Sequence, residues 1–358
     1  GEEAFESILK DLRSAEKFIF MEYFIIGSGV MLDQILDILK EKVKHGVVVR
    51  IIYDDFGSIN AIPPHFIKEM ESIGIQTRRF NPYKPMLSVI MNDRDHRKIL
   101  VIDGRVAHTG GYNIADEYIN KKIRFGYWKD AGIRVEGECV NSFTTMFLEM
   151  WNYINKDNAV HDEYLNPHNT FSQSEKSGFV QPFCDSPLEH DDVGENLYVS
   201  IISRAKKYIY IFTPYLILGT ELSHAMISAA RSGVDVRIVV PKIPDKKLIY
   251  LQTKANFRPL IEAGVRIYLY TPGFIHSKCI VADDDTAIVG TCNLDFRSMY
   301  WNFEDFVYMY RTQCIGKIKE DAIETFAVSE EVYEESTNDI SFAGRLLQSI
   351  LQLFAPLL

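Results

Sequence analysis

The sequence predicts an α/β fold built from two duplicated halves, and a repeated motif is the first reason. The pattern H-x-K-x4-D occurs at residues 96–103 and again at residues 276–283. Each copy is followed by a glycine-containing turn and an asparagine, Asn113 in the first copy and Asn293 in the second. The two histidines and the two asparagines are separated by the same distance, because 276 − 96 and 293 − 113 both equal 180. Such a repeat indicates a duplicated structural unit.

Strand and helix patterns alternate in both copies of this unit. Apolar, β-branched runs at residues 47–52 and 234–239 predict strands that are buried on both faces. A helical spacing of apolar residues precedes each run, over residues 31–39 and 222–230, and ends at a glycine. This alternation is typical of an α/β sheet.

The domain boundaries follow from composition. We expect residues 1–156 to form the first half and residues 189–358 the second. Residues 157–188 are rich in Asn, Ser, Pro and acidic side chains and show little periodicity, which predicts a linker. Apolar residues at helical spacing over residues 342–354 predict an amphipathic C-terminal helix. Two interpretations of that helix stay open: it covers the core, or it lies on a membrane surface.

The composition excludes several classes of protein. Of the 358 residues, 47% are hydrophobic and 25% are charged, which is the balance of a globular protein with a sizeable core. The 49 acidic and 39 basic residues give a net charge of −10, so we expect no nucleic-acid partner. No stretch approaches the roughly 20 apolar residues that span a bilayer. No cluster of His, Cys, Asp or Glu has the spacing of metal ligands, so no metal and no other cofactor is expected.

The chemistry of the motif points to a phosphodiester. Residues i and i+2 of a strand point to the same face, so the histidine and lysine of each copy share a pocket. Two imidazoles, two ammonium groups and two amides provide convergent donors for phosphate oxygens; these are His96, Lys98, Asn113, His276, Lys278 and Asn293. One histidine would act as the nucleophile and the other as the general acid. A single copy of the motif is weak evidence, whereas two copies in register favour one shared site.

The paired motifs resemble those of the phospholipase D superfamily, in which H-x-K-x4-D is followed by a G-G/S/T-x-N element. Within it the chain is similar to the bacterial cardiolipin synthase family, and the stretches that carry the similarity are residues 19–25, 53–58, 93–118, 213–215 and 290–304. The resemblance implies two phospholipase D-like α/β sandwich halves packed around one shared active site. It also implies a phosphatidyltransferase that forms a phosphatidyl-histidine. In the family, phosphatidylglycerol is usually both donor and acceptor, and glycerol is released.

The resemblance assigns roles to particular residues. His96 is expected to attack phosphorus, while His276 serves as the acid and then as the base. The two lysines and the two asparagines would hold the phosphate. An acidic residue downstream of each asparagine would orient a histidine: Glu304, eleven residues after Asn293, in the second half, and Asp130, seventeen residues after Asn113, in the first. Asp103 and Asp283 complete the catalytic motif, and we expect them to hold the loop that carries it.

The resemblance also implies partners and a location. Phosphatidylglycerol, other phospholipids and an anionic membrane surface are the expected partners, at the bacterial cytoplasmic membrane with the catalytic part facing the cytoplasm. The family usually begins with one or two spanning helices, so an N-terminal anchor is expected to be absent from this chain. A hydrolytic phospholipase D or another phosphodiesterase of the superfamily is the alternative function. The choice between phosphatidylglycerol and phosphatidylethanolamine as donor, and the oligomeric state, stay open.

Overall fold

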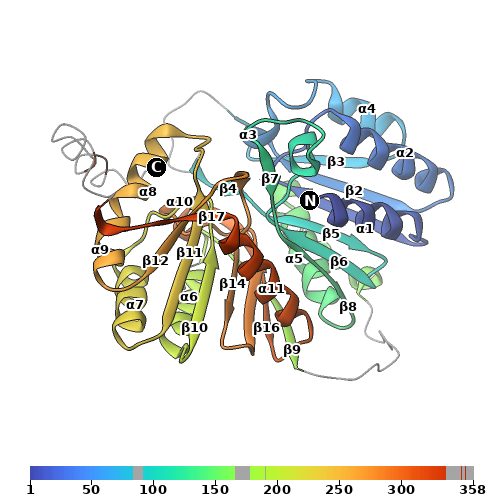
Figure 1. The fold of residues 1–358 in the computed structure, drawn as a ribbon. Helices are drawn as coiled ribbons and strands as arrows, with labels where there is room; N and C mark the ends of the chain where they lie inside the picture. Colours follow the sequence, from blue (N-terminus) through green and yellow to red (C-terminus); the bar gives the residue numbers. More distant parts are fainter. Residues whose placement is uncertain (84–91, 166–177, 190, 336–347, 349–350, 352–358) are drawn as a thin grey trace.

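The computed structural model in Figure 1 describes residues 1–83, 92–165, 178–189, 191–335, 348 and 351. Two large sheets lie side by side, each with helices on its faces. Among the described residues, no helix combines the length and the apolar character needed to cross a membrane. Most of the predicted C-terminal helix lies outside the described residues.

The first half contains a sheet of six strands. Its elements are α1 (Glu2–Arg13), β1 (Phe18–Tyr23), α2 (Val30–Lys44), β2 (Val48–Asp54), α3 (Asp55–Ser58), α4 (Phe66–Ser72), β3 (Gln76–Phe80), β4 (Arg94–Asp95), β5 (Lys98–Ile102), β6 (Val106–Gly110), η2 (Asp116–Ile119), β7 (Tyr127–Lys129), β8 (Gly132–Glu136) and α5 (Val140–Asn155). The strand order is β3-β2-β1-β5-β6-β8. Every residue of β1 and β5 is buried, which explains why these strands are nearly continuous apolar runs.

The second half repeats this order. Its elements are η3 (Asp162–Tyr164), β9 (Phe179–Asp185), α6 (Val193–Arg204), β10 (Tyr208–Phe212), α7 (Thr220–Arg231), β11 (Asp235–Pro241), α8 (Lys247–Ala255), α9 (Phe257–Glu262), β12 (Arg266–Tyr270), β13 (Gly273–Ile275), β14 (Cys279–Ala282), β15 (Thr286–Gly290), α10 (Phe296–Tyr300), β16 (Asn302–Tyr310), α11 (Cys314–Ala327) and β17 (Ser329–Val332). The order β12-β11-β10-β14-β15-β16 matches that of the first half, which confirms the duplicated α/β fold. Strand β9 falls within the predicted linker, yet it pairs with β16 in antiparallel register.

Two short parallel pairs join the halves. Strand β7 of the first half pairs with β13 of the second, and β4 of the first half pairs with β16 of the second. One hydrophobic core also contains residues of both halves, including Phe20 and Phe147 from the first and Val281 and Phe326 from the second. The halves therefore share a buried interior, and both H-x-K motifs lie where the short strand pairs cross between them.

Candidate active site

Each motif histidine lies in the short segment that leads into a central strand. His96 falls between β4 and β5, and His276 falls between β13 and β14, so the histidines precede the strands in which we expected them. The backbone N–H of His96 donates to the carbonyl of Phe303 (2.9 Å), and that of His276 donates to the carbonyl of Lys129 (2.7 Å). Each histidine is thus fixed by a strand of the opposite half.

The orienting carboxylates are exchanged between the halves. His96 Nδ1 lies 2.8 Å from an oxygen of Glu304, and His276 Nδ1 lies 2.8 Å from an oxygen of Asp130. We expected Glu304 to serve the second half and Asp130 the first, so this part of the prediction is wrong. The reason is the strand pairing: Glu304 follows the residues of β16 that pair with β4, and Asp130 follows the residues of β7 that pair with β13.

Burial favours the neutral form of both imidazoles. Burial lowers the pKa of His96 and of His276 to about 4, although the adjacent carboxylate acts in the opposite direction. Burial alone would raise the pKa of Glu304, but its contacts with His96 and the nearby Lys98 lower it to about 2. A carboxylate opposite Nδ1 favours the tautomer that is protonated there, which leaves the Nε2 lone pair for chemistry. At His276 the Nδ1 atom also lies 2.9 Å from Nζ of Lys278.

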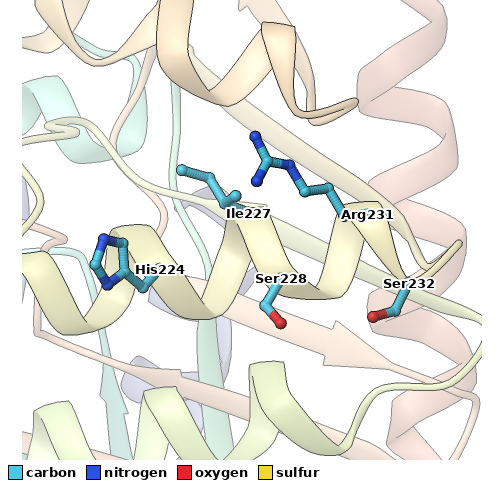
Figure 2. Close-up of a pocket in the computed structure, with 5 residues that line it drawn as sticks. All are labelled: His224, Ile227, Ser228, Arg231 and Ser232. Atoms are coloured by element: carbon cyan, nitrogen blue, oxygen red, sulfur yellow. The ribbon is translucent and has the colours of Figure 1, made fainter.

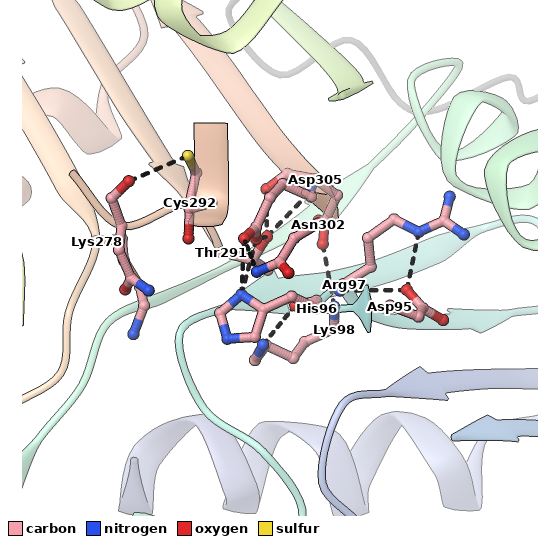
Figure 3. A network of polar contacts seen from close by, with 12 residues as sticks. Asp95, His96, Arg97, Lys98, Lys278, Thr291, Cys292, Asn302 and Asp305 are labelled. Atoms are coloured by element: carbon pink, nitrogen blue, oxygen red, sulfur yellow. Dashed lines mark hydrogen bonds and ion pairs between the residues drawn. The ribbon is translucent and has the colours of Figure 1, made fainter. Parts of the chain in front are cut away.

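The lysines bring the two motifs into one site. Lys98 and Lys278 are buried, and each ammonium group donates to the backbone carbonyl of its own motif histidine. Burial lowers the pKa of Lys98 to about 8 and that of Lys278 to about 7. The charge of Lys278 also lowers the pKa of His96, and the charge of Lys98 lowers that of His276. Figure 3 shows His96, Lys98 and Lys278 together.

The two asparagines are not equivalent. Asn113 Oδ1 accepts from the backbone N–H of Ile25 (2.9 Å), and its Nδ2 donates to the hydroxyl of Tyr118 (2.7 Å). The Oδ1 of Asn293 is buried and has no hydrogen-bond partner among the described residues. Oδ1 of Asn293 is therefore left to accept a hydrogen bond, whereas both amide atoms of Asn113 are engaged within the protein.

Several residues at the site were not found from the sequence. Glu304 accepts from the Thr291 hydroxyl and, at 3.1 Å, from the amide of Asn302, while the neighbouring Asp305 accepts from the backbone N–H of Lys98 (3.0 Å) (Figure 3). In the first half Gly111 stands at the position of Thr291, and a Cβ there would lie 2.1 Å from Asp130. That clash explains a glycine at this position.

Aromatic rings surround His276. The ring centroid of Trp128 lies 5.3 Å from that of His276, and the ring of Tyr118 lies 5.6 Å away. Both aromatic residues come from the first half, whereas the histidine that they surround belongs to the second half. Their positions depend on how the halves dock, and no spacing in the sequence could have indicated them.

The motif aspartates lie at the far ends of the central strands. The Asp103 carboxylate accepts from the backbone N–H groups of Glu16, Lys17 and Phe18. The Asp283 carboxylate makes the equivalent contacts with residues 206–208. Both aspartates also have left-handed backbone conformations, with φ of 54° and 52°. These contacts fix the start of β1 and β10, and the expected role of the two aspartates in holding the motif loop stays a prediction.

Two further features bear on ligand binding. Within the parts of the chain that the structure describes, no group of three or more His, Cys, Asp or Glu side chains is arranged to hold a metal ion. A surface hollow lies along α7, lined by His224, Ile227, Ser228, Arg231 and Ser232 (Figure 2). All five residues come from one helix and the residue after it, and none belongs to either motif, so this hollow is separate from the candidate site.

Comparison with known proteins identifies the family. The chain matches the cardiolipin synthase, phospholipase D-like domain family over residues 8–151 and 198–326. An uncharacterised Streptococcus mutans protein is 48% identical over the whole chain, which covers 77% of that relative. A cardiolipin synthase of Alkalihalophilus pseudofirmus is 39% identical over the whole chain, which covers 71% of that enzyme.

A solved structure confirms the architecture. The phosphatidylserine synthase of Haemophilus influenzae superimposes with a TM-score of 0.74, at 15% identity, over 99% of this chain and 91% of that one. At this identity the likeness concerns the fold alone. Together with the family match over both halves, it leads to one conclusion: the chain belongs to the cardiolipin synthase family of the phospholipase D superfamily, a family of phosphatidyltransferases.

Proposed function

We propose that this enzyme transfers a phosphatidyl group from one phosphatidylglycerol to the glycerol hydroxyl of another, giving cardiolipin and free glycerol. The observation that carries the proposal is the pair of buried histidine–carboxylate contacts made across the halves, with a lysine beside each histidine. Two neutral imidazoles in one site allow one ring to attack phosphorus while the other handles the proton.

In the first step His96 Nε2 attacks the phosphorus of the donor lipid. The bond between phosphorus and the headgroup glycerol oxygen breaks, and His276 gives its Nε2 proton to that oxygen. His276 must therefore be protonated when substrate is bound, and the negative phosphodiester supports this because a nearby anion raises a histidine pKa. Lys98, Lys278 and Asn293 would hold the phosphate oxygens as charge develops on them.

In the second step the intermediate is resolved by an alcohol. The glycerol hydroxyl of a second phosphatidylglycerol attacks phosphorus, and His276, now neutral, takes its proton. The phosphorus–nitrogen bond to His96 breaks and both histidines return to their starting states. Hydrolysis differs only in that water replaces the alcohol, so the lipid product distinguishes the two reactions.

Analysis of the products tests this function. The protein would be incubated with phosphatidylglycerol carrying isotope-labelled headgroup glycerol, and lipids and water-soluble products would be separated. We expect cardiolipin and labelled glycerol in equal amounts. Phosphatidic acid as the sole lipid product would show that the enzyme is a hydrolase, and turnover that requires phosphatidylethanolamine would show a different donor.

The substrates imply a location as well. Both lipids have acyl chains that stay in a bilayer, so the site has to open towards the bacterial cytoplasmic membrane. The observation in support is the family of the chain, whose relatives include named cardiolipin synthases. We expect the protein to associate with vesicles that contain phosphatidylglycerol.

A further inference from the structure

The segment between the motif asparagine and the carboxylate that contacts a histidine is longer in the first half than in the second. It spans seventeen residues (130 − 113) in the first half and eleven (304 − 293) in the second. Helices η2 and α10 both begin three residues after the asparagine. After α10 only Trp301 precedes β16, whereas residues 120–126 lie between η2 and β7, and we call these seven residues the basic loop. The extra length is therefore confined to the basic loop.

The tip of the basic loop is apolar and surrounded by cations. Ile123 is 82% exposed, the largest exposed fraction among the large hydrophobic side chains that the structure describes. Lys121, Lys122 and Arg124 flank it and are also exposed. No ion pair within the described chain involves either lysine, while Arg124 lies 3.4 Å from Glu117. Three cations within four consecutive residues stand out in a protein with a net charge of −10.

The base of the basic loop is fixed beside the candidate active site. Asn120 Oδ1 accepts from the backbone N–H of Trp128 (2.7 Å), and Asn120 Nδ2 donates to the Trp128 carbonyl (3.1 Å). The Trp128 ring packs against His276, and the Phe125 ring lies 5.7 Å from that of Phe274. The base of the basic loop is therefore anchored to Trp128, which lies against His276.

Further exposed apolar residues continue along the same edge. Phe56 and Ile59, both exposed, follow β2. The backbone N–H of Ser28 donates to the carbonyl of Ala61 (2.9 Å), and the backbone N–H of Gly27 donates to the carbonyl of Ile114 (2.7 Å). Residues 27 and 28 thus link the segment that carries Phe56 and Ile59 to the segment that leads into η2.

We propose that the basic loop is a membrane-docking element, with Ile123 entering the acyl boundary and Lys121, Lys122 and Arg124 contacting anionic lipid headgroups. The inference rests on the proposed lipid substrate. Charge complementarity carries the assignment, since a local cationic cluster on an acidic protein is attracted to an anionic bilayer and an apolar tip adds burial there. Docking at this loop would present lipid headgroups to the side of the site formed by His276 and Trp128.

Vesicle binding tests the docking element directly. Co-sedimentation would compare vesicles of phosphatidylglycerol and phosphatidylcholine with vesicles of phosphatidylcholine alone, at low salt. We expect the full chain to bind the anionic vesicles preferentially. Each lysine removed in Lys121→Gln and Lys122→Gln should weaken that binding about fivefold. Ile123→Ser should weaken binding to both kinds of vesicle.

Matched controls come from other surfaces of the chain. Lys206 and Lys207 form an exposed lysine pair at the start of β10, and Val160 is 76% exposed. The variants Lys206→Gln/Lys207→Gln and Val160→Ser should bind like the parent chain. Equal losses in the control and loop variants, or no preference of the parent chain for anionic vesicles, would overturn the proposal.

A soluble substrate separates this inference from the proposed function. Loop variants should turn over a monomeric, short-chain phosphatidylglycerol at the parent rate, because no membrane is involved. A loss of that activity in the loop variants would mean that the loop supports the site and is not a docking element. Failure of the parent chain to act on the short-chain lipid, with vesicle binding intact, would count against the proposed function and leave the docking element supported.

Discussion

The surroundings of His96 and of His276 differ strongly, although their motifs have identical spacing. Behind His96 lies a group of buried charges, in which Arg97 lies 2.6 Å from Glu22 and 3.2 Å from Asp95. Close by, Arg94 lies 3.5 Å from Asp54, which also accepts from the backbone N–H of Asp95 (3.0 Å). Figure 3 shows Arg97 and Asp95 beside His96.

The second half has apolar or neutral residues at the matching places. By strand register, Phe212 corresponds to Glu22 and Pro241 to Asp54. By the 180-residue offset, Ile275 corresponds to Asp95 and Ser277 to Arg97. The duplication therefore kept the histidine, lysine and asparagine of each motif and allowed the layer behind them to diverge. Buried ion pairs rarely add net stability, so we interpret the charged layer as positioning His96 and not as a source of stability.

The largest expected effect concerns the two histidines. Replacing either should lower turnover of phosphatidylglycerol by about 10³-fold or more. A p-nitrophenyl phosphodiester has a leaving group that needs no proton, so His276→Ala should still accumulate an adduct on His96, whereas His96→Ala should form none. Mass spectrometry of the quenched protein would detect the adduct.

Other outcomes of that experiment would change the assignment. An adduct on His276 in the His96→Ala variant would reverse the two roles. If neither histidine carries an adduct, the covalent mechanism is wrong. The parent protein with the same substrate serves as the control for turnover of the intermediate.

The second prediction compares Arg97 with Ser277. Arg97→Met should lower the free energy of unfolding by about 3–5 kcal/mol, because it leaves the buried carboxylates of Glu22 and Asp95 without their cation. Ser277→Ala should change it by less than about 1 kcal/mol, because the buried Ser277 hydroxyl has no hydrogen-bond partner among the described residues. Denaturant unfolding of both variants would measure the difference, and equal effects would contradict the asymmetry.

The third prediction compares the two asparagines. Asn293→Ala should lower kcat/KM by about 10²-fold, the size expected for one lost donor to a developing oxyanion, and leave stability nearly unchanged. Asn113→Ala should lower the free energy of unfolding by about 1–3 kcal/mol, because it leaves the backbone N–H of Ile25 and the Tyr118 hydroxyl without these hydrogen-bond partners. Kinetics and thermal unfolding of both variants test this; a stability loss in Asn293→Ala alone would contradict it.

The sequence predicted the two repeated α/β halves well, but it did not predict the contacts between them. The 180-residue offset and the buried apolar runs gave the duplicated α/β fold, because a motif repeated in register and strands buried on both faces leave clear patterns. The exchange of Glu304 and Asp130 was missed because it depends on two parallel pairs of only two and three residues. Pairs that short leave no periodicity in a sequence.

The charged layer was missed for another reason. Glu22 interrupts an apolar run, which from sequence alone argues only against a membrane span. Its partner Arg97 lies between a histidine and a lysine, where an arginine resembles a solvent-exposed residue. Only the fold brings the two together across β1 and β5. Predictions about the linker boundaries and the roles of the site residues stay predictions.

The smallest expected effect is a difference between the two lysines in pH dependence. Lys98 lies near the carboxylates of Glu304 and Asp305, which raise its pKa. The carboxylate of Asp130 raises the pKa of Lys278, but the charge of Lys98 lowers it. Burial lowers the pKa of Lys98 only to about 8 and that of Lys278 to about 7. The ammonium form binds phosphate, so as pH rises Lys278 should lose its charge first.

We therefore expect the ionisation of Lys278 to lower kcat/KM for a soluble short-chain phosphatidylglycerol about fivefold between pH 7 and pH 8, because kcat/KM reports the protonation of the free enzyme. Lys278→Arg should lower the overall rate but remove the part of the fall that comes from residue 278, so that its pH profile is shallower than that of the parent protein, since arginine stays charged. Lys98→Arg should leave the fall near pH 7 in place, which makes it the matched control. Circular dichroism at each pH would show that the protein stays folded. A kcat/KM that is constant up to pH 9 in the parent protein would mean that Lys278 is charged throughout, and the electrostatic difference between the two halves would then not reach the phosphate.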